Sequence, residues 1–255
     1  MRKTVNVLRM PTEVTSYIQT MQTIDSWQMQ LTLNRTPNAK YVCVANVHMC
    51  MEAFDDPTFA TILQTADMVL PDGRPIFWAQ KLLGFKSAQQ VHGPLLTIEL
   101  LKHAQAQGIT VGFYGSTQTV LDELVNKLKK DYQHLKIVCA ISPPFRELTT
   151  EEDQQFSDQI NQSGVQLLFV GLGCPKQERW MFEHKNKINC VMIGVGAAFD
   201  FLAGHKKMAP QWMRSLGLEW VFRLASEPRR LWKRYFKHNP RFLFYLGLQV
   251  FGRKY

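Results

Sequence analysis

The chain has 255 residues, of which 45% are hydrophobic and 20% are charged. These proportions are typical of a folded globular protein with a sizeable core, and they exclude a disordered or fibrous chain. The formal net charge of +9 is unevenly distributed, because twelve of the 30 Lys and Arg but only two of the 21 acidic residues lie from His205 onward. The sequence therefore predicts a neutral body, residues 1–204, and a basic appendage, residues 205–255.

The cysteines and the apolar runs indicate where the protein works. The five cysteines lie far apart without a C-x-x-C pair, so neither a zinc site nor a disulfide framework is indicated. The basic first residues are not followed by the apolar run of a secretory signal. The longest apolar stretch, residues 242–251, is about half a membrane span. We expect a cytoplasmic protein without a spanning helix.

In chain order, short apolar or β-branched runs alternate with helix-like segments. The expected strands are residues 41–46, 67–70, 109–114, 136–140, 165–171 and 190–196. Amphipathic helices are expected at residues 94–108 and 119–132, and a capping signature at Thr149 opens another. Because several strands lack polar alternation, both faces of the sheet are expected to be covered. The pattern predicts an α/β fold with a Rossmann-like, mostly parallel sheet flanked by helices.

Polar residues follow the first two strands, where ligands bind in an open parallel sheet. Asn46 could hydrogen-bond a sugar hydroxyl, and His48 could act as an acid or base; alternatively, Asn46 is a helix N-cap. Asp72, in Pro-Asp-Gly, is well placed as a general base, although this tripeptide is also an ordinary turn. Residue type alone leaves these alternatives open.

Two later strand ends carry glycines. Residues 112–117 (GFYGST) could approach a phosphate through the Gly115 backbone, or could form a plain tight turn. Residues 171–178 (GLGCPKQE) add Lys176, a cation where a helix dipole favours phosphate, and Gln177, an amide that donates and accepts. Neither stretch is the G-x-G-x-x-G of a dinucleotide site.

The tail after Pro228 predicts an amphipathic helix. Leu231, Trp232, Tyr235 and Phe236 fall on one arc, and basic residues fill the opposite side. Such a helix suits an anionic membrane surface. The alternatives are a helix packed on the body with a solvated basic face, or a nucleic-acid contact, which is disfavoured because the aromatic residues do not interleave with the cations.

Taken together, several motifs resemble those of the WecG/TagA/CpsF family of bacterial glycosyltransferases over roughly residues 41–235. They are residues 171–178, GVGAAFDFLAG at 194–204, AP-x-W at 209–212 and GLEW-x-x-RL-x-x-EPRR at 217–230, with Asn46, Pro-Asp-Gly and Val-x-Gly at 91–93 in the same order. Two positions depart from the family pattern: Val44 stands where Thr is frequent, and Gln90 where Arg is frequent.

The resemblance implies an inverting, metal-independent transfer of an N-acetylmannosamine-like or related hexose from a UDP-sugar to a polyprenyl-diphosphate-linked acceptor, in surface polysaccharide or teichoic acid synthesis. It matches Asp72 to the catalytic base, with Asn46 and Gln177 as catalytic partners. We expect the substrate-binding residues to be His48, Gln90, Gly115, Gly173, Lys176, Gly196, Asp200, Arg214, Arg223, Arg229 and Arg230.

No metal ligand set and no cofactor is expected, since the acidic pair Asp55-Asp56 lacks D-x-D spacing. The expected partners are the UDP-sugar, the lipid-linked acceptor and the inner face of the plasma membrane, without nucleic acid; exposed aromatic residues also allow a homo-oligomer. Two other functions remain compatible with the α/β pattern and basic tail: a nucleotide-linked oxidoreductase and a non-enzymatic membrane or nucleic-acid adaptor.

Overall fold

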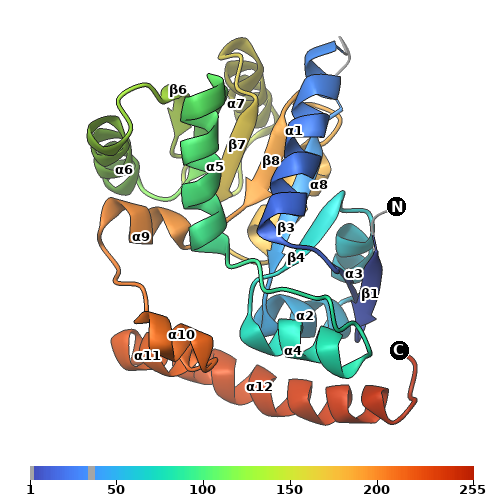
Figure 1. Cartoon of the computed structure of the whole chain (residues 1–255). Helices are drawn as coiled ribbons and strands as arrows, with labels where there is room; N and C mark the ends of the chain where they lie inside the picture. Colours follow the sequence, from blue (N-terminus) through green and yellow to red (C-terminus); the bar gives the residue numbers. More distant parts are fainter. Residues whose placement is uncertain (1–2, 34–37) are drawn as a thin grey trace. The chain divides into compact units, whose positions relative to one another are not determined.

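A computed structural model describes residues 3–33 and 38–255, and the described residues form a six-stranded parallel sheet, a two-stranded antiparallel sheet and helices (Figure 1). The large sheet has the strand order β4-β3-β8-β7-β5-β6. Its strands are β3 (Lys40–Ala45), β4 (Met68–Pro71), β5 (Thr110–Gly115), β6 (Lys136–Ile141), β7 (Leu167–Gly171) and β8 (Val191–Gly194). All six strands predicted from the sequence are confirmed, and most of their ends shift by one or two residues.

The helices are α1 (Tyr17–Leu33), α2 (Val47–Asp55), α3 (Pro57–Gln64), α4 (Arg74–Leu82), α5 (Gly93–Gln107), α6 (Gln118–Asp131), α7 (Thr150–Gln162), α8 (Lys176–His184), α9 (Ala198–Ala203), α10 (Gln211–Ser215), α11 (Glu219–Ser226) and α12 (Pro228–Val250). The predicted capping box is present, because the Thr149 side chain accepts from the Glu152 N–H and the Glu152 carboxylate accepts from the Thr149 N–H. The predicted helices at residues 94–108 and 119–132 are α5 and α6.

Contacts between Cα atoms divide the chain into two compact units. Unit 1 contains residues 1–16, 44–92 and 207–255, and unit 2 contains residues 17–43 and 93–206. The sequence predicts a catalytic core that ends at Gly204 and an appendage that begins at His205. That boundary stays a prediction.

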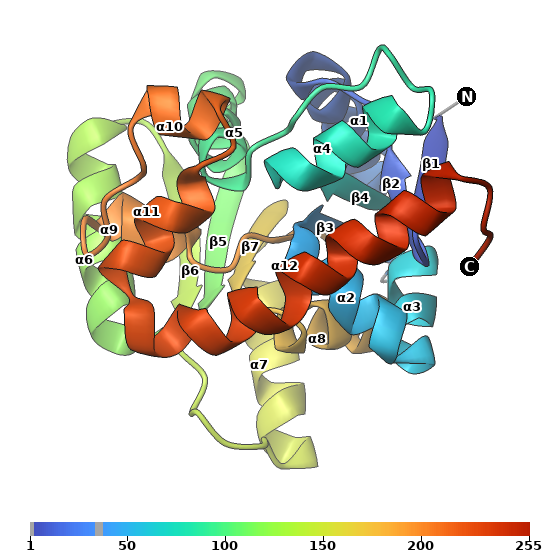
Figure 2. The ribbon, with the colours of Figure 1, turned by 90° about the horizontal axis from the view of Figure 1, so that it is seen from below.

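Unit 2 carries the centre of the parallel sheet. In register, Val111 pairs with Leu167 and Leu167 with Val191. Helices α1 and α5 cover one face of these strands, and α7 and α8 cover the other (Figures 1 and 2). Because both faces are covered, β7 and β8 are almost wholly buried, as their uninterrupted apolar sequences predict.

Unit 1 contains an N-terminal hairpin that the sequence analysis did not predict. It consists of β1 (Thr4–Val7) and β2 (Met10–Glu13), and β2 contacts β4. The fully buried Gln80 of α4 donates through Nε2 to Thr12 Oγ1 and to the Glu13 carbonyl, both at 2.9 Å. These bonds satisfy the buried amide nitrogen of Gln80 and fix α4 to the hairpin.

The C-terminal helix α12 packs against α2 within unit 1 (Figure 2). Its buried residues Leu231, His238, Phe242 and Leu246 recur at helical spacing, so one face is docked. At its C-terminal end the Gln249 amide accepts from Leu8 N at 2.9 Å and donates to the Asn6 carbonyl at 2.8 Å. The alternative of a tail helix packed on the body is therefore confirmed for this face.

The predicted aromatic arc of α12 separates into docked and exposed residues. Leu231 is buried, whereas Trp232 and Phe236 are 48% and 73% exposed. Among the described residues, no helix combines the length and apolar character needed to span a bilayer.

Candidate active site

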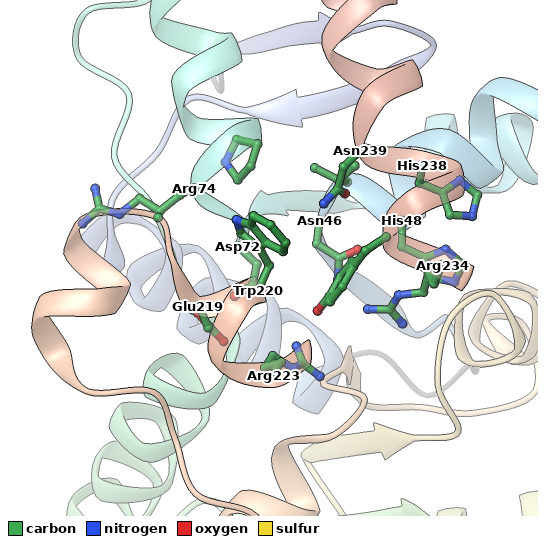
Figure 3. Close-up of a pocket in the computed structure, with 15 residues that line it drawn as sticks. Asn46, His48, Asp72, Arg74, Glu219, Trp220, Arg223, Arg234, His238 and Asn239 are labelled. Atoms are coloured by element: carbon green, nitrogen blue, oxygen red, sulfur yellow. The ribbon is translucent and has the colours of Figure 1, made fainter. Parts of the chain in front are cut away.

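Unit 1 contains a small cavity at the ends of β3 and β4 (Figure 3). Asn46 follows β3 and Asp72 follows β4, and both line this cavity, as the strand-end argument predicts. The rest of the wall comes from the starts of α2 and α4 and, more than 140 residues further along the chain, from Gly217, α11 and α12. The lining residues are Asn46, Val47, His48, Asp72, Gly73, Arg74, Pro75, Gly217, Glu219, Trp220, Arg223, Arg234, Tyr235, His238 and Asn239.

Asn46 serves as a helix cap and also lines the cavity. Its Oδ1 accepts from the Met49 N–H at 3.2 Å, which satisfies one of the free donors at the start of α2. The carbonyl of the preceding Ala45 accepts from the N–H groups of Asp72 at 2.9 Å and Gly73 at 3.1 Å. The cap alternative is thus confirmed, and the same backbone fixes the Asn46 and Asp72 segments together.

The bend that carries Asp72 is held through its backbone. The Gln90 amide donates to the Asp72 carbonyl, and the Val91 N–H donates to the Pro71 carbonyl at 3.0 Å. Gln90 therefore stabilises the backbone of the bend through a hydrogen bond, a role that the sequence analysis did not predict. The half-buried Asp72 side chain is a carboxylate on the wall of a cavity, which suits a general base.

A buried ion pair connects α11 to the segment that follows this bend. His92 Nε2 lies 3.1 Å from Glu219 Oε2, with the two side chains 8% and 26% exposed. Burial alone would lower the pKa of His92, but the hydrogen bond to Glu219 and the negative charges of Asp72 and Glu219 outweigh it and hold that pKa above its ordinary value. Burial likewise opposes the charge of Glu219, and His92 holds the pKa of that carboxyl below its usual range. The pair is therefore ionised in weakly acidic solution.

The predicted tail arginines occupy different environments. Arg223 lines the cavity, and the structure adds Arg234, which the sequence analysis missed (Figure 3). The Arg214 carbonyl accepts from Arg74 Nε at 3.1 Å, and Arg214 Nε donates to the Ala209 carbonyl at 3.1 Å. Two exposed arginines, Arg229 and Arg230, do not line this cavity, and Arg230 pairs with Glu227 at 2.6 Å.

The structure also brings together side chains that could hold a metal ion. Among the described residues, the group consists of His48, Glu52 and His238. His48 and His238 line the cavity, so this group adjoins the predicted base.

In unit 2, Gln177 joins the loops that follow β7 and β8. It is buried, and its Oε1 accepts from the N–H groups of Gly173 at 3.2 Å and Gly196 at 3.1 Å. Its Nε2 donates to Glu178 Oε1 at 2.7 Å. Burial raises the pKa of Glu178 to about 7. Gln177 therefore positions the backbone of two predicted binding loops.

A larger cavity of about 810 Å³ lies in unit 2, beyond the ends of β5 and β7. The chain leaves these neighbouring strands toward opposite sides, to β6 and to β8, which makes this a topological switch point. The cations Arg146, Lys176, Arg179 and Lys187 line the cavity together with Ser116 and the stacked ring of Trp180. Lys176 therefore lies where the sequence predicts an anion site.

Two further predicted residues of unit 2 have structural partners. Gly115 has φ +115°, and a Cβ there would lie 2.7 Å from the backbone of Gly171, so only glycine fits. The Asp200 carboxylate on α9 lies 3.4 Å from Lys206 Nζ. The predicted site residues are divided between the two units. Unit 1 contains Asn46, His48, Asp72, Gln90 and the predicted tail arginines, and unit 2 contains Gly115, Gly173, Lys176, Gln177, Gly196 and Asp200.

Comparison with known proteins identifies the family to which the chain belongs. The family model described as "Glycosyl transferase WecG/TagA/CpsF family" matches residues 5–255. A protein of Bacillus spizizenii is 29% identical over 195 residues, which cover 76% of this chain and 74% of the relative. A protein of Staphylococcus aureus strain MW2 is 27% identical over 228 residues, which cover 89% and 86%. Both relatives are named N-acetylglucosaminyldiphosphoundecaprenol N-acetyl-beta-D-mannosaminyltransferase.

Proposed function

The chain belongs to the WecG/TagA/CpsF family of glycosyl transferases, and from this we propose that it transfers N-acetylmannosamine or a related hexose from a UDP-sugar to a polyprenyl-diphosphate-linked acceptor. The names of the relatives support the sugar and the lipid-linked acceptor. The observation that carries the proposal is the position of Asp72, a carboxylate on a cavity wall that also holds Arg223 and Arg234. Membership in the family favours a transferase over the oxidoreductase and adaptor alternatives.

In the proposed reaction, the Asp72 carboxylate accepts the proton of an acceptor hydroxyl as its oxygen attacks the anomeric carbon. The new carbon–oxygen bond forms on the face opposite UDP, and the bond to the diphosphate breaks with its electron pair. A single displacement inverts the anomeric centre. No step is assigned to a metal ion; cations and amides stabilise the departing diphosphate, and one such group contributes about 3 kcal/mol.

The unit 2 cavity supports a donor site. We assign the diphosphate to Lys176, which lines this cavity at the start of α8, and to the strand-end loops of Gly115 and Gly173. Gly196 and Asp200 are assigned to the rest of the donor. Gln177 supports the site as a positioning residue, since its carboxamide holds Gly173 and Gly196.

The basic residues of α11 and α12 support an acceptor site. Arg223 and Arg234 reach the cavity that contains Asp72, and guanidinium groups bind diphosphate oxygens in a bidentate manner. Arg214, Arg229 and Arg230 are assigned to the lipid-linked diphosphate outside the cavity wall. His48 and Asn46 are assigned to the acceptor sugar, and Gln90 holds the Asp72 bend.

The exposed face of α12 supports docking on an anionic membrane. Trp232, Phe236, Leu243 and Val250 are all exposed, and at 100° per residue they fall within an arc of about 40°. Lys233 lies beside this stripe, where lipid phosphates would meet it. We propose that the protein works peripherally on the inner face of the plasma membrane.

The function is tested by incubating the purified protein with a panel of UDP-sugars and a short polyprenyl-diphosphate-linked GlcNAc. We expect transfer from UDP-N-acetylmannosamine with inversion, detected as a β-linked disaccharide. Transfer with retention, or no transfer from any UDP-sugar, would contradict the proposal. Membrane docking is tested separately: replacing Trp232 and Phe236 with Ser is expected to abolish sedimentation with anionic vesicles without lowering Tm.

A further inference from the structure

We propose that His48, Glu52 and His238 form a Zn²⁺ site that fastens helix α12 to helix α2. The proposal goes beyond glycosyl transfer and does not depend on it, because all three residues lie in unit 1 and the site needs no substrate.

Two of the three residues are paired by helix geometry. His48 and Glu52 are four residues apart on α2, so their side chains project from one face of that helix. His238 comes from α12, which packs against α2. A ligand shared by the three residues would therefore connect two segments that are almost 190 positions apart in sequence.

The distances fit a shared ion better than direct hydrogen bonds. His48 Nδ1 lies 3.6 Å from Glu52 Oε1, and His238 Nε2 lies 3.5 Å from the same oxygen. Both separations exceed the range of an N–H···O hydrogen bond. Ligands about 2.1 Å from a tetrahedral zinc ion lie about 3.4 Å from one another, close to these values. All three ligand atoms lie within 4.8 Å of one another, and the two imidazole rings are tilted by 58°.

The ligand types favour zinc over magnesium or calcium. Two imidazole nitrogens and one carboxylate oxygen form a set used by three-ligand zinc sites, whereas Mg²⁺ and Ca²⁺ prefer oxygen ligands. Such a site leaves one coordination position open. His48 and His238 both line the cavity that contains Asp72, so we place the open position on the cavity side.

The burial of the three ligands and the charges around them determine how tightly we expect zinc to bind. The side chains of His48, Glu52 and His238 are 15%, 29% and 5% exposed, so two imidazoles are largely shielded from water. Glu52 supplies one negative charge, and the adjacent Asp55 is already paired with Arg241 at 2.5 Å. Lys237 and Arg234 are cationic neighbours of His238. Because their charges oppose a divalent cation, we expect binding of micromolar strength.

The site would hold the part of α12 that presents Arg234 and Asn239 to the cavity. Docking of α12 otherwise depends on its buried residues Leu231, Phe242 and Leu246, on the hydrogen bonds of Gln249 and on the Asp55–Arg241 pair. Zinc that binds the folded unit and not the unfolded chain stabilises it by mass action. Removal of the metal is therefore expected to loosen α12 without unfolding unit 2.

The test uses metal-free full-length protein dialysed against Zn²⁺ or Co²⁺ without any sugar nucleotide. We expect about one zinc per chain by atomic emission, a rise in Tm with Zn²⁺ but not Mg²⁺, and the visible absorption of tetrahedral Co²⁺. Glu52→Gln and His238→Phe should each weaken binding more than about 100-fold, because loss of an outer-shell partner alone costs 10- to 100-fold. His103→Gln is the matched control, since His103 pairs with Asp25 in unit 2 and should leave zinc content unchanged.

Failure of wild-type protein to retain zinc above the buffer level would overturn the proposal. Equal zinc content in wild type and His238→Phe would also overturn it. Circular dichroism of the metal-free proteins checks that both variants fold like wild type. A protein that binds zinc but transfers no sugar would refute the proposed function alone, and a protein that transfers sugar but binds no zinc would refute this inference alone.

Discussion

The buried pair His92–Glu219 gives a prediction with a defined pH dependence. Replacement of Glu219 by Gln removes the carboxylate and leaves His92, which is 8% exposed, with a neutral partner. Loss of one member of a fully buried pair costs 3–5 kcal/mol, and exposed pairs contribute at most about 1 kcal/mol. Because the Glu219 side chain is 26% exposed, we expect a loss of about 2 kcal/mol near pH 6.

The pKa shifts fix the sign of this dependence. The pKa of His92 is raised, so its contribution is complete below about pH 6.5 and is lost as pH rises through the folded-state pKa. The pKa of Glu219 is lowered, so its contribution is present above about pH 4.3 and is lost as pH falls. The pair therefore stabilises most strongly between these values. At pH 9 His92 is neutral while Glu219 stays ionised, so only a hydrogen bond from the imidazole to the carboxylate remains. A Gln side chain can accept the same bond, so the loss in Glu219→Gln should fall to about 1 kcal/mol.

Urea unfolding followed by tryptophan fluorescence at pH 6 and pH 9 measures this difference. The control is Glu123→Gln, since Glu123 lies 2.5 Å from His205 but both side chains are well exposed, at 50% and 39%. We expect the control to lose less than about 1 kcal/mol at either pH. An equal loss at the two pH values for Glu219→Gln, or a larger loss at pH 9, would refute the reasoning.

Two further predictions concern stability and can be checked by thermal or urea unfolding. Phe242→Ala, at a position 1% exposed, should cost about 3–5 kcal/mol, whereas the 65% exposed neighbour Leu243 should tolerate Ala within about 0.5 kcal/mol; equal losses would show that α12 is not docked through this face. Gly115→Ala should cost about 3 kcal/mol or more because its Cβ would meet the Gly171 backbone at 2.7 Å, whereas Gly164→Ala, at φ +67° in open space, should cost only about 1 kcal/mol.

The sheet could be predicted because its strands are apolar runs bounded by Gly, Pro and Asp. The N-terminal hairpin could not, since its strands have four residues each and Pro11 lies inside the second. A proline within a short polar run argues against a strand unless tertiary contacts support it. Here the buried Gln80 supplies such contacts from α4. Helix α4 was not predicted either, and it begins at Arg74, directly after the Pro-Asp-Gly tripeptide for which a turn was one of the two interpretations.

Asn46 and Asp72 could be predicted because ligands bind beyond the ends of parallel strands, and each residue directly follows a strand that the sequence predicts. The same argument could not predict the roles of His92, Glu219, Arg234 or His238, because these residues reach their partners only when the C-terminal helices pack on the rest of unit 1. The four-residue spacings Glu219–Arg223 and Arg234–His238 were the available signal, since each pair shares one helix face. Composition likewise could not predict that Gln90 holds the backbone of Asp72.

The most direct measurement is the turnover of Asp72→Asn with a UDP-sugar and a lipid-linked acceptor. The substitution preserves shape and removes the base, so kcat should fall by about 10²–10⁴-fold while Tm and UDP binding stay unchanged. Asp122→Asn, at a surface position of unit 2 that pairs with Gln118, is the control and should retain full turnover. Near-wild-type turnover of Asp72→Asn would contradict the assignment of Asp72 as the base.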